Sequence, residues 1–250
     1  RSAREGYDVR KGRPESPIAD GIDLAVHSMK DVETVRADIF DICAMLPRAD
    51  VRDRLIGAAS LEELKQGARV GTSSPRRAAQ LQRARADLQI VPLRGNVATR
   101  LAHIQNGDAD ATLLAAAGLD RLDMSDVGAA LPLSQFLPAA SQGAVGIDRL
   151  TSRTELVPFL AAINDVDTFV AVHAERALLE ALGGNCHSPI AALAQVEGSQ
   201  IRLKAEVFTA DGAEMHAGEI VYDTSSNGPA LLADQLLAKA SDELRSMFAS

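Results

Sequence analysis

Strand-like and helical segments alternate over residues 69–118, and this alternation restricts the possible folds more than any other feature of the sequence. The first helix has a clear start signal, because Ser74 is a favourable N-cap and Pro75 suits the first helical position. Strands separated by helices of about 10–12 residues are typical of a parallel sheet with both faces covered. The predicted strands are 69–71, 89–93 and 110–118, and the predicted helices are 74–86 and 96–107.

Three segments outside residues 69–118 also predict strands or a helix. Residues 21–28 alternate between apolar and other side chains, which predicts a strand. Residues 142–148 are predicted to return to that sheet as a short buried strand. Residues 60–67 carry a capping box, with Ser60 three residues before Glu63, and this predicts a helix.

The pattern changes near Thr168, which indicates a second kind of domain. A helix is predicted from there to the glycine pair at 183–184, a plausible C-cap. Alternating segments follow, with Gly198 and residues 211–212 at their turns, and the chain ends in an amphipathic helix. The predicted strands are 190–196, 201–209 and 214–223, and the predicted helix is 229–248. This part therefore reads as a small α+β domain.

The composition limits the classes of function. The chain has 250 residues, of which 46% are hydrophobic, so it can bury a sizeable core. The 26 Lys and Arg against 34 Asp and Glu give a formal net charge of −8, which argues against a general nucleic-acid-binding protein. Two cysteines make no disulfide framework, no apolar run predicts a membrane span, and the polar first 17 residues, predicted to be irregular, do not resemble a signal peptide. We therefore expect a cytoplasmic protein that binds neither nucleic acid nor a membrane.

Arginines gather at two corresponding loops of the predicted parallel sheet. Arg76 and Arg77 lie in the first turn of a helix, where unpaired backbone N–H groups favour anions over cations. Arg94 lies in the next strand-to-helix loop, and Arg100 is one turn into its helix. Because such loops meet at the carboxyl edge of a parallel sheet, the four side chains can converge on one polyanionic small molecule, which would offset the unfavourable placement of the arginines. The alternative is a set of solvated surface arginines.

Two further motifs carry candidate chemistry. Lys30 and Asp31 directly follow a strand, and an aspartate there can stabilise a cation or move a proton, although an ordinary charged loop has the same pattern. Cys186 lies in the segment Gly183–Ile190, between glycines and a proline. Its neighbour His187 has a poor spacing for chelating a metal or forming a catalytic pair, so we expect no metal site. A buried core residue, a nucleophile and an attachment point for a covalent group are all compatible with this thiol.

Six segments taken together resemble the porphobilinogen deaminases, also called hydroxymethylbilane synthases. They are DLAVHSMKDV, VGTSSPRRAAQL, LRGNVATRL, AAAGLDRL, LPAASQGAVGI and GGNCHSPIAA. They occur in the order of the family and at family-like distances, and the resemblance extends from about Ala19 to the C-terminus. Each segment by itself is modest, but six in series are highly specific.

The resemblance implies an α/β protein of three domains. Two are lobes similar to those of type 2 periplasmic binding proteins, and the third is a small C-terminal α+β domain that carries the cysteine. The expected domains are residues 1–46 with 144–161, then 50–138, then 165–250. The family begins with a strand, a SPLAL-like loop and a glycine- and lysine-rich segment that the first residues here do not match. We therefore expect domain 1 to be incomplete at its N-terminus.

The resemblance also implies a reaction and a site. The family condenses four porphobilinogen molecules head to tail, with loss of ammonia each time, onto a dipyrromethane cofactor, and water then releases hydroxymethylbilane. It implies that Cys186 holds the cofactor through a thioether and that Asp31 contacts pyrrole nitrogens and assists proton transfer, in a protein expected to be a monomer. The residues implied to line the cleft for cofactor and substrate are Ser28, Lys30, Thr72, Ser73, Ser74, Arg76, Arg77, Arg94, Asn96, Arg100, Arg121 and Gln142.

Two alternative functions fit part of the pattern. A non-catalytic small-anion-binding module of the periplasmic-binding type explains the alternating strands and helices and the arginines, but it gives no role to Cys186 or to the C-terminal domain. An inactive, truncated relative is the other alternative, because the opening segment of the family is not matched.

Overall fold

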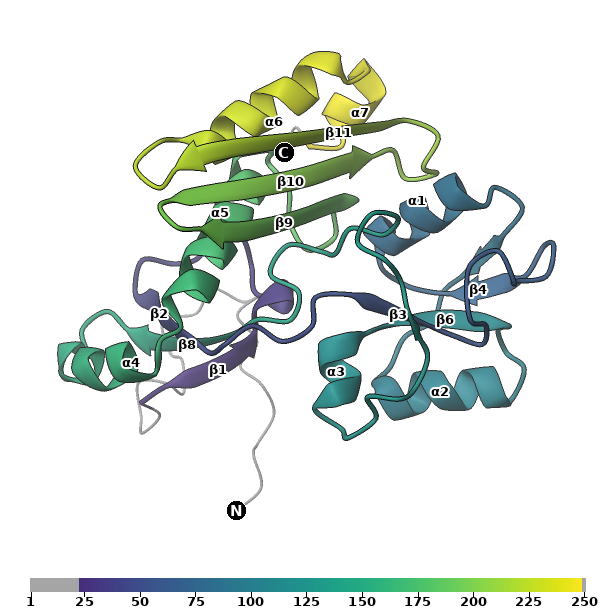
Figure 1. Cartoon of the computed structure of the whole chain (residues 1–250), viewed down its shortest axis with the longest axis horizontal. Coiled ribbons are helices and arrows are strands. Elements are labelled where there is room, and N and C mark those ends of the chain that lie inside the picture. Colours follow the sequence, from purple (N-terminus) through teal and green to yellow (C-terminus); the bar gives the residue numbers. More distant parts are fainter. Residues whose placement is uncertain (1–22, 249–250) are drawn as a thin grey trace.

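The computed structural model describes residues 23–248, and these form three β-sheets with helices packed on them (Figure 1). The predictions for the first 17 residues, for residues 21–22 and for the N-terminal part of domain 1 lie outside the described residues. The α/β class is confirmed. In chain order the elements are β1 (Ala25–Ser28), η3 (Met29–Asp31), β2 (Phe40–Met45), β3 (Asp53–Ile56), β4 (Arg69–Gly71), α1 (Pro75–Ala84), β5 (Gln89–Val91), α2 (Val97–Gln105), β6 (Ala111–Ala115), α3 (Ala116–Asp120), β7 (Ala129–Ala130), β8 (Val145–Leu150), η4 (Thr154–Leu156), α4 (Val157–Ile163), α5 (Val166–Ala181), β9 (Ile190–Glu197), β10 (Gln200–Phe208), β11 (Met215–Asp223), α6 (Gly228–Lys239) and α7 (Asp242–Ser246).

The first sheet has the strand order β1-β8-β2, and both pairs are antiparallel. The predicted return of the chain to the sheet of β1 is confirmed, because β8 lies between β1 and β2. One face of β1 is open: Val26 is 65% exposed, whereas His27 on the other face contacts the buried Asp148 at 3.0 Å. The strand β2 has no counterpart in the sequence prediction.

The middle sheet has the order β5-β4-β6-β3-β7. The predicted alternation is confirmed over β4, β5 and β6, where β4 pairs in parallel with both neighbours. The sheet is nevertheless mixed, because β3 pairs antiparallel with β6 and β7, so the prediction of a parallel sheet holds for only part of it. The helix α1 lies on one face, and α2 and α3 lie on the other (Figure 1).

Three predicted elements were wrong in extent or type. Residues 60–67 form turns instead of a helix, and they bury Leu61 and Leu64 in the core of the middle sheet. The predicted strand at 110–118 ends at Ala115, where α3 begins. The predicted C-terminal helix is interrupted at Ala240, which is extended, and Ser241 then caps α7.

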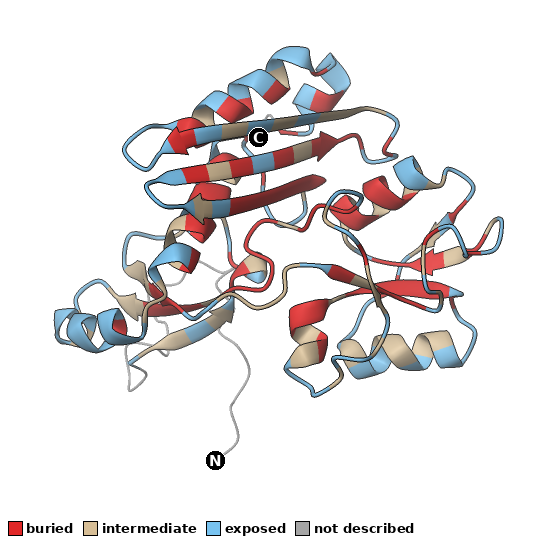
Figure 2. Cartoon of the chain, viewed as in Figure 1, coloured by how far each residue is buried: buried red, intermediate tan, exposed pale blue. Residues whose placement is uncertain are grey.

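The third sheet has the order β11-β10-β9 and is antiparallel throughout. Its core is shared with α5 and α6, and Figure 2 shows buried residues alternating with less buried ones along β10. Within residues 23–248 no single helix is long and apolar enough to cross a membrane. The segments Thr154–Ile163 and Val166–Ala181 meet that criterion, by length and composition only, as a pair bent by 109°.

Two connections run side by side between the first sheet and the middle sheet. The backbone N–H of Ala49 donates to the carbonyl of Gly143 at 3.2 Å, and that of Leu46 donates to the carbonyl of Val145 at 3.0 Å. Gly143 has φ +83°, and a Cβ there would lie 2.6 Å from the carbonyl oxygen of Ala49. Only glycine combines this conformation with so close an approach.

The buried carboxylate of Glu175 in α5 joins both connections to the third sheet. Arg48 donates to its two oxygens at 2.7 and 2.9 Å. The backbone N–H of Ser141 donates to Oε2 at 2.6 Å, and that of Ala194 in β9 donates to Oε1 at 2.8 Å. Glu175 is 0% exposed, and a charge buried this deeply is tolerated only with such partners.

We predict that Glu175→Gln lowers the free energy of unfolding by about 3–5 kcal/mol, the usual cost of removing one partner of a buried ion pair. The substituted amide places an NH2 group against a donor on one side, so at least one hydrogen bond becomes a donor–donor contact. Urea unfolding followed by circular dichroism measures the change. Glu180→Gln, at an exposed position of the same helix, is the control. Equal stability of the two variants would contradict the role of Glu175 in joining the two connections to the third sheet.

Candidate functional site

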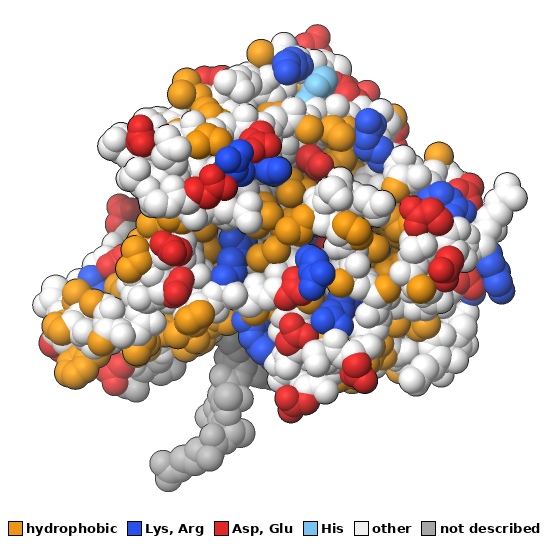
Figure 3. Space-filling model, in the orientation of Figure 1, with side chains coloured by type: hydrophobic (Ala, Val, Ile, Leu, Met, Phe, Trp, Pro, Cys, Tyr) orange, Lys and Arg blue, Asp and Glu red, His pale blue; other side chains and the backbone are white. Residues whose placement is uncertain are grey.

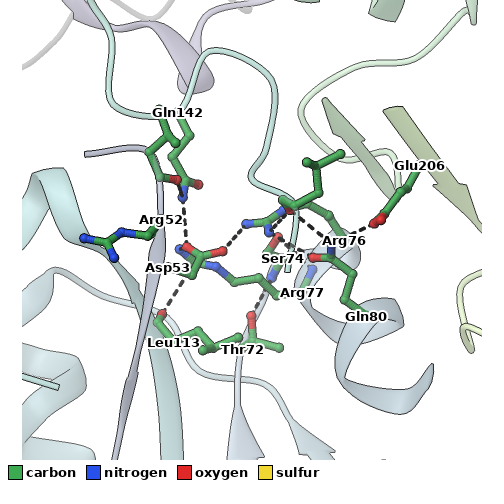
Figure 4. Close-up of polar contacts among 12 residues, drawn as sticks. Arg52, Asp53, Thr72, Ser74, Arg76, Arg77, Gln80, Leu113, Gln142 and Glu206 are labelled. Carbon is green, nitrogen blue, oxygen red and sulfur yellow. Dashed lines mark hydrogen bonds and ion pairs between the residues drawn. The ribbon is translucent and has the colours of Figure 1, made fainter. Parts of the chain in front are cut away.

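A buried cluster of charges lies where the middle sheet meets the connections. Asp53 in β3 is 0% exposed, and its carboxylate accepts from Arg76 Nη2 at 2.8 Å and from Arg77 Nη2 at 2.5 Å. Gln142 Nε2 donates to the same carboxylate at 3.0 Å. Figure 4 shows these side chains converging from β3, α1 and the 139–144 connection. The start of α1 aims both arginines inward, because Ser74 caps the helix by accepting from the N–H of Arg77.

The charges of this cluster shift the proton affinities of its members. Burial by itself would raise the pKa of Asp53, but the guanidinium groups of Arg76 and Arg77 hold it well below its usual range. Burial lowers the pKa of Lys30, and the nearby Arg77 lowers it further. Two guanidinium groups share the one carboxylate of Asp53, so positive charge remains in excess there. Such a site attracts an anion.

One pocket brings four of the sequence-predicted residues together. These are Lys30, Ser74, Arg76 and Cys186, which come from η3, the start of α1 and the loop between α5 and β9. Lys and Arg side chains are visible around the centre of the face in Figure 3, where the three parts of the molecule meet. The other lining residues are Met29, Val32, Ala139, Ala140, Ser141, Arg176, Leu179, Asn185, Ser188 and Ile190.

The loop that carries Cys186 is held by its own side chains. The backbone N–H of Asn185 donates to Ser188 Oγ at 3.0 Å, and Asn185 Oδ1 accepts from the N–H of His187 at 2.8 Å. Cys186 itself is exposed, which excludes the interpretation as a buried core residue. Partial burial raises the pKa of its thiol, and the carboxylates of Asp31 and Glu33 raise it further. The surroundings therefore do not stabilise a thiolate, unlike those of a catalytic cysteine nucleophile.

Arg176 in α5 holds the segment that follows Asp31. Its guanidinium donates to the carbonyl of Val32 at 3.2 Å, to that of Thr34 at 3.1 Å, and also to that of the intervening Glu33. Thr34 Oγ1 in turn donates to the carbonyl of Gly184 at 3.2 Å. The segment after Asp31 is thereby tied to the loop of Cys186.

The remaining predicted residues lie outside this pocket. Several of them organise the two strand-to-helix loops: the N–H of Ser74 donates to Thr72 Oγ1, Ser73 Oγ donates to the carbonyl of Leu93, and Asn96 caps α2. Arg100 donates to the carbonyl of Gly95 and lies close enough to Arg77 for its pKa to be lowered, mainly by burial and then by that charge. Of the others, Arg121 donates to the carbonyl of Gly143, and Ser28 and Arg94 are exposed.

The sequence reasoning missed Asp53 and Arg176. It expected a bound anion to offset the placement of Arg76 and Arg77 at a helix start, whereas the structure provides an internal carboxylate for both. The available signal was the charge of Asp53 beside the apolar Leu55 and Ile56 in one short strand, since a charge at a buried position is tolerated only when it is paired. No group of three or more His, Cys, Asp or Glu able to hold a metal occurs in the part of the chain that the structure describes.

We predict that Asp53→Asn lowers the free energy of unfolding by about 3 kcal/mol at pH 7, because Arg76 and Arg77 then lack an anionic partner. The folded-state pKa of Asp53 is depressed, so its contribution is present above the pKa of the unfolded chain, about 4, and is lost as the pH falls further. Chemical denaturation at pH 7 and below pH 4 measures both effects.

The matched control for this measurement is Asp23→Asn, whose partner Arg153 lies at the surface. An exposed pair contributes little, so we expect a small change that disappears in salt. An Asp53→Asn variant as stable as the wild type at pH 7, or one whose deficit grows in acid, would contradict the paired cluster.

Comparison with known proteins gives two family matches. Residues 15–157 match the model of the porphobilinogen deaminase, dipyromethane cofactor binding domain, and residues 169–240 match that of the porphobilinogen deaminase C-terminal domain. Two solved structures also show similarity, a periplasmic sulfonate-binding protein of Methylobacillus flagellatus with 15% identity and a domain of Bordetella pertussis BvgS with 20% identity. The first covers 66% of this chain and 52% of its own, with a TM-score of 0.34. The second covers 58% of this chain and 62% of its own, with a TM-score of 0.33. Both scores are too low to establish a shared fold.

Curated relatives agree with the family models. The porphobilinogen deaminase of Sphingopyxis alaskensis is 53% identical over 93% of this chain and 75% of its own length. That of Paracoccus denitrificans is 46% identical over 89% of this chain and 73% of its own length, and that of Nitrobacter winogradskyi is 44% identical over 92% and 72%. The chain thus spans about three quarters of the length of these relatives. With both family models matched in order and nearly half or more of the aligned residues identical, the chain belongs to the porphobilinogen deaminase family.

Proposed function

We propose that the pocket shared by Cys186, Lys30 and Arg76 is the active site of a hydroxymethylbilane synthase. The chain is a transferase of tetrapyrrole biosynthesis that uses porphobilinogen as its substrate and carries a dipyrromethane cofactor. It joins four porphobilinogen molecules head to tail with loss of ammonia, and hydrolysis then releases hydroxymethylbilane. The observation that supports this site most strongly is the exposed thiol of Cys186 in one pocket with the buried cations.

The residues around Cys186 fit a carboxylate-bearing dipyrromethane. Buried Nε atoms of Arg76 and Arg77 have no hydrogen-bond partner among the described residues, and Arg76 lines the pocket. A buried guanidinium N–H without a partner is costly, so a ligand carboxylate would satisfy it. When bound to Cys186 through a thioether, the cofactor supplies the pyrrole to which the first substrate is added. Because this link is covalent, addition becomes effectively intramolecular.

Asp31 is the residue that we assign to the chemical step. Its carboxylate is exposed at the end of η3 and is close enough to Cys186 to raise the pKa of that thiol. Loss of ammonia from porphobilinogen leaves an electron-poor ring, and a carboxylate beside it stabilises the positive charge on the ring nitrogen. The same oxygen can then accept the proton that is released when the new bond forms.

The cationic residues hold the carboxylates of cofactor and substrate in this proposal. Each pyrrole carries an acetate and a propionate, so negative charge increases with every addition. Arg76 and Arg77 are the buried cations, Lys30 is half-buried, and the pKa of Arg100 is lowered by burial and then by the charge of the nearby Arg77. The other proposed contacts are Ser28, Thr72, Ser73, Ser74, Arg94, Asn96, Arg121 and Gln142. A non-catalytic anion-binding module would need the cations but would leave Cys186 without a role.

We also propose how the chain is divided and where it acts. The three sheets correspond to domains at residues 1–46 with 144–161, at 50–138 and at 165–250. The first two are proposed to be lobes of the periplasmic-binding type. The enzyme is proposed to act as a monomer in the cytoplasm, without nucleic acid or a membrane as partner.

We expect purified protein, made in cells with an intact tetrapyrrole pathway, to carry a two-pyrrole adduct that survives denaturation. Cys186→Ser is expected to abolish the adduct, because serine cannot form the thioether. Intact-mass spectrometry reads both results. Cys43→Ser is the control: this half-buried thiol donates to the carboxylate of Asp41 at 3.2 Å and does not line the pocket, so its loss leaves the adduct in place. An unmodified wild-type mass would contradict the proposed function.

For Asp31→Asn, we expect the adduct to be retained in at least part of the protein and turnover to fall by about 100-fold or more, the usual range for loss of a proton-transfer group. Porphobilinogen consumption under steady-state conditions gives the rate. Asp38→Asn, at an exposed position seven residues further along, provides the comparison and should turn over normally. Near-normal turnover of Asp31→Asn would remove this residue from the mechanism.

A further inference from the structure

The helix that carries Arg76 is packed directly against the third sheet. Gly212, in the turn between β10 and β11, approaches α1 so closely that a Cβ would lie 2.3 Å from the carbonyl oxygen of Ala79. Apolar side chains from both elements and from the connection between them fill the rest of the contact. The buried members of this cluster are Ala79, Leu137, Ala191, Leu193 and Phe208.

One polar chain crosses this contact and ends on Arg76. Gln80 Nε2 donates to Glu206 Oε2 at 3.2 Å and to the carbonyl of Leu137 at 3.0 Å. Arg76 Nη1 donates to Gln80 Oε1 at 2.9 Å and to the same carbonyl at 3.0 Å. Figure 4 shows Glu206 reaching from the third sheet toward Gln80, with the guanidinium of Arg76 between Gln80 and Asp53. Gln80 and Arg76 are 4% and 3% exposed, so neither exchanges these partners for water.

The two acceptors on Gln80 Nε2 set the orientation of the amide. An amide presents one oxygen and one NH2 group, and rotating it by half a turn exchanges them. With Glu206 in place, the rotated amide would turn its oxygen toward a carboxylate and its NH2 group toward Arg76. Both contacts would be repulsive, and an unpaired polar group at a buried position is costly. Glu206 and the carbonyl of Leu137 therefore together keep the acceptor of Gln80 directed at Arg76.

We infer that Glu206 is a positioning residue: through Gln80 it holds the guanidinium of Arg76 in the orientation that receives a carboxylate of the group on Cys186. This inference rests on the proposed function of the pocket. Arg76 makes no hydrogen bond through Nε to any described residue, and it lines the pocket that contains Cys186. Nη2 of Arg76 donates to Asp53, and Nη1 donates to Gln80 and Leu137. Because the guanidinium is planar, these hydrogen bonds also fix the direction of its Nε–H group.

The third sheet and the loop that leads into it thus carry both Cys186, which holds the cofactor, and Glu206, which positions Arg76. Glu206 in β10 pairs with Ala191 in β9, and the loop of Cys186 leads directly into β9. The pairing of β9 with β10 therefore sets the distance between the thiol of Cys186 and the carboxylate of Glu206. Partial burial raises the pKa of Glu206, while the hydrogen bond from Gln80 and then the charge of Arg76 oppose that rise.

The test compares Glu206→Ala with Glu206→Gln. Intact-mass spectrometry of freshly purified protein gives the ratio of chains with the two-pyrrole adduct to chains without it. For Glu206→Ala we expect this ratio, and kcat/KM for porphobilinogen, to fall by about 5- to 30-fold, the range that follows from losing one or two buried hydrogen bonds. For Glu206→Gln we expect at least partial recovery of both, because a glutamine oxygen still accepts from Gln80 Nε2. Glu219→Ala, which alters an exposed carboxylate of the same sheet, should match the wild type.

The melting temperature distinguishes the positioning role of Glu206 from a purely structural role. In a Cys186→Ser background, which removes the cofactor, Glu206→Ala should melt within about 4 °C of its parent, the shift expected from losing one hydrogen bond in a chain of this length. The double variant Gln80→Ala with Glu206→Ala should be no worse than the more affected single variant, because both residues act through one relay.

Several results would overturn the inference. They are a Glu206→Ala protein with wild-type loading and kcat/KM, a Glu206→Gln protein as impaired as Glu206→Ala, additive losses in the double variant, or a large drop in melting temperature without the cofactor. A wild-type protein without the adduct is a different result: it would reject the proposed function, and the inference with it.

Discussion

Four hydrogen bonds meet on the buried carboxylate of Glu175, and the relative placement of the three sheets depends on them. Arg48 belongs to one connection between the first and middle sheets, Ser141 belongs to the other, and Ala194 belongs to the third sheet. A single carboxylate therefore fixes the crossing point of the two connections against the sheet that carries Cys186. The strength of this junction comes from burial, since the same ion pair in water would contribute little.

The pocket follows from this junction. Gln142, next to Ser141, reaches the carboxylate of Asp53, so the connection that Glu175 holds also touches the cluster with Arg76 and Arg77. On the opposite side, Arg176 directly follows Glu175 in α5 and ties the segment after Asp31 to the loop of Cys186. Adjacent residues of one helix thus organise both walls of the pocket. A cationic site of this kind is pre-formed, so binding an anion requires little rearrangement of the protein.

Local sequence signals predicted the parts of this protein whose structure is decided locally. The N-cap at Ser74, the alternation that marks β4 to β6 and the glycine pair after α5 were all read from short segments. The capping box at Ser60 failed because burying Leu61 and Leu64 between two tight turns outweighs helix propensity. The site was predicted as a set of residue types, but the partner of Arg76 and Arg77 was not, because Asp53 is more than 20 residues away in sequence and only strand pairing brings it there. The exposure of Cys186 likewise depends on tertiary packing.

The central place of β8 in the first sheet has a consequence for the order in which the chain can fold. Among residues 23–248, the strands β1 and β2 do not pair with each other, and each pairs with β8. Because β8 begins at Val145, 100 residues after β2 ends at Met45, both strands leave the ribosome long before their partner exists. The middle sheet is continuous in sequence between them and can form during that interval, so it gives the two early strands a folded neighbour before their own ladder is made. The ladders of the first sheet can consequently form only after all the strands of the middle sheet have been synthesised.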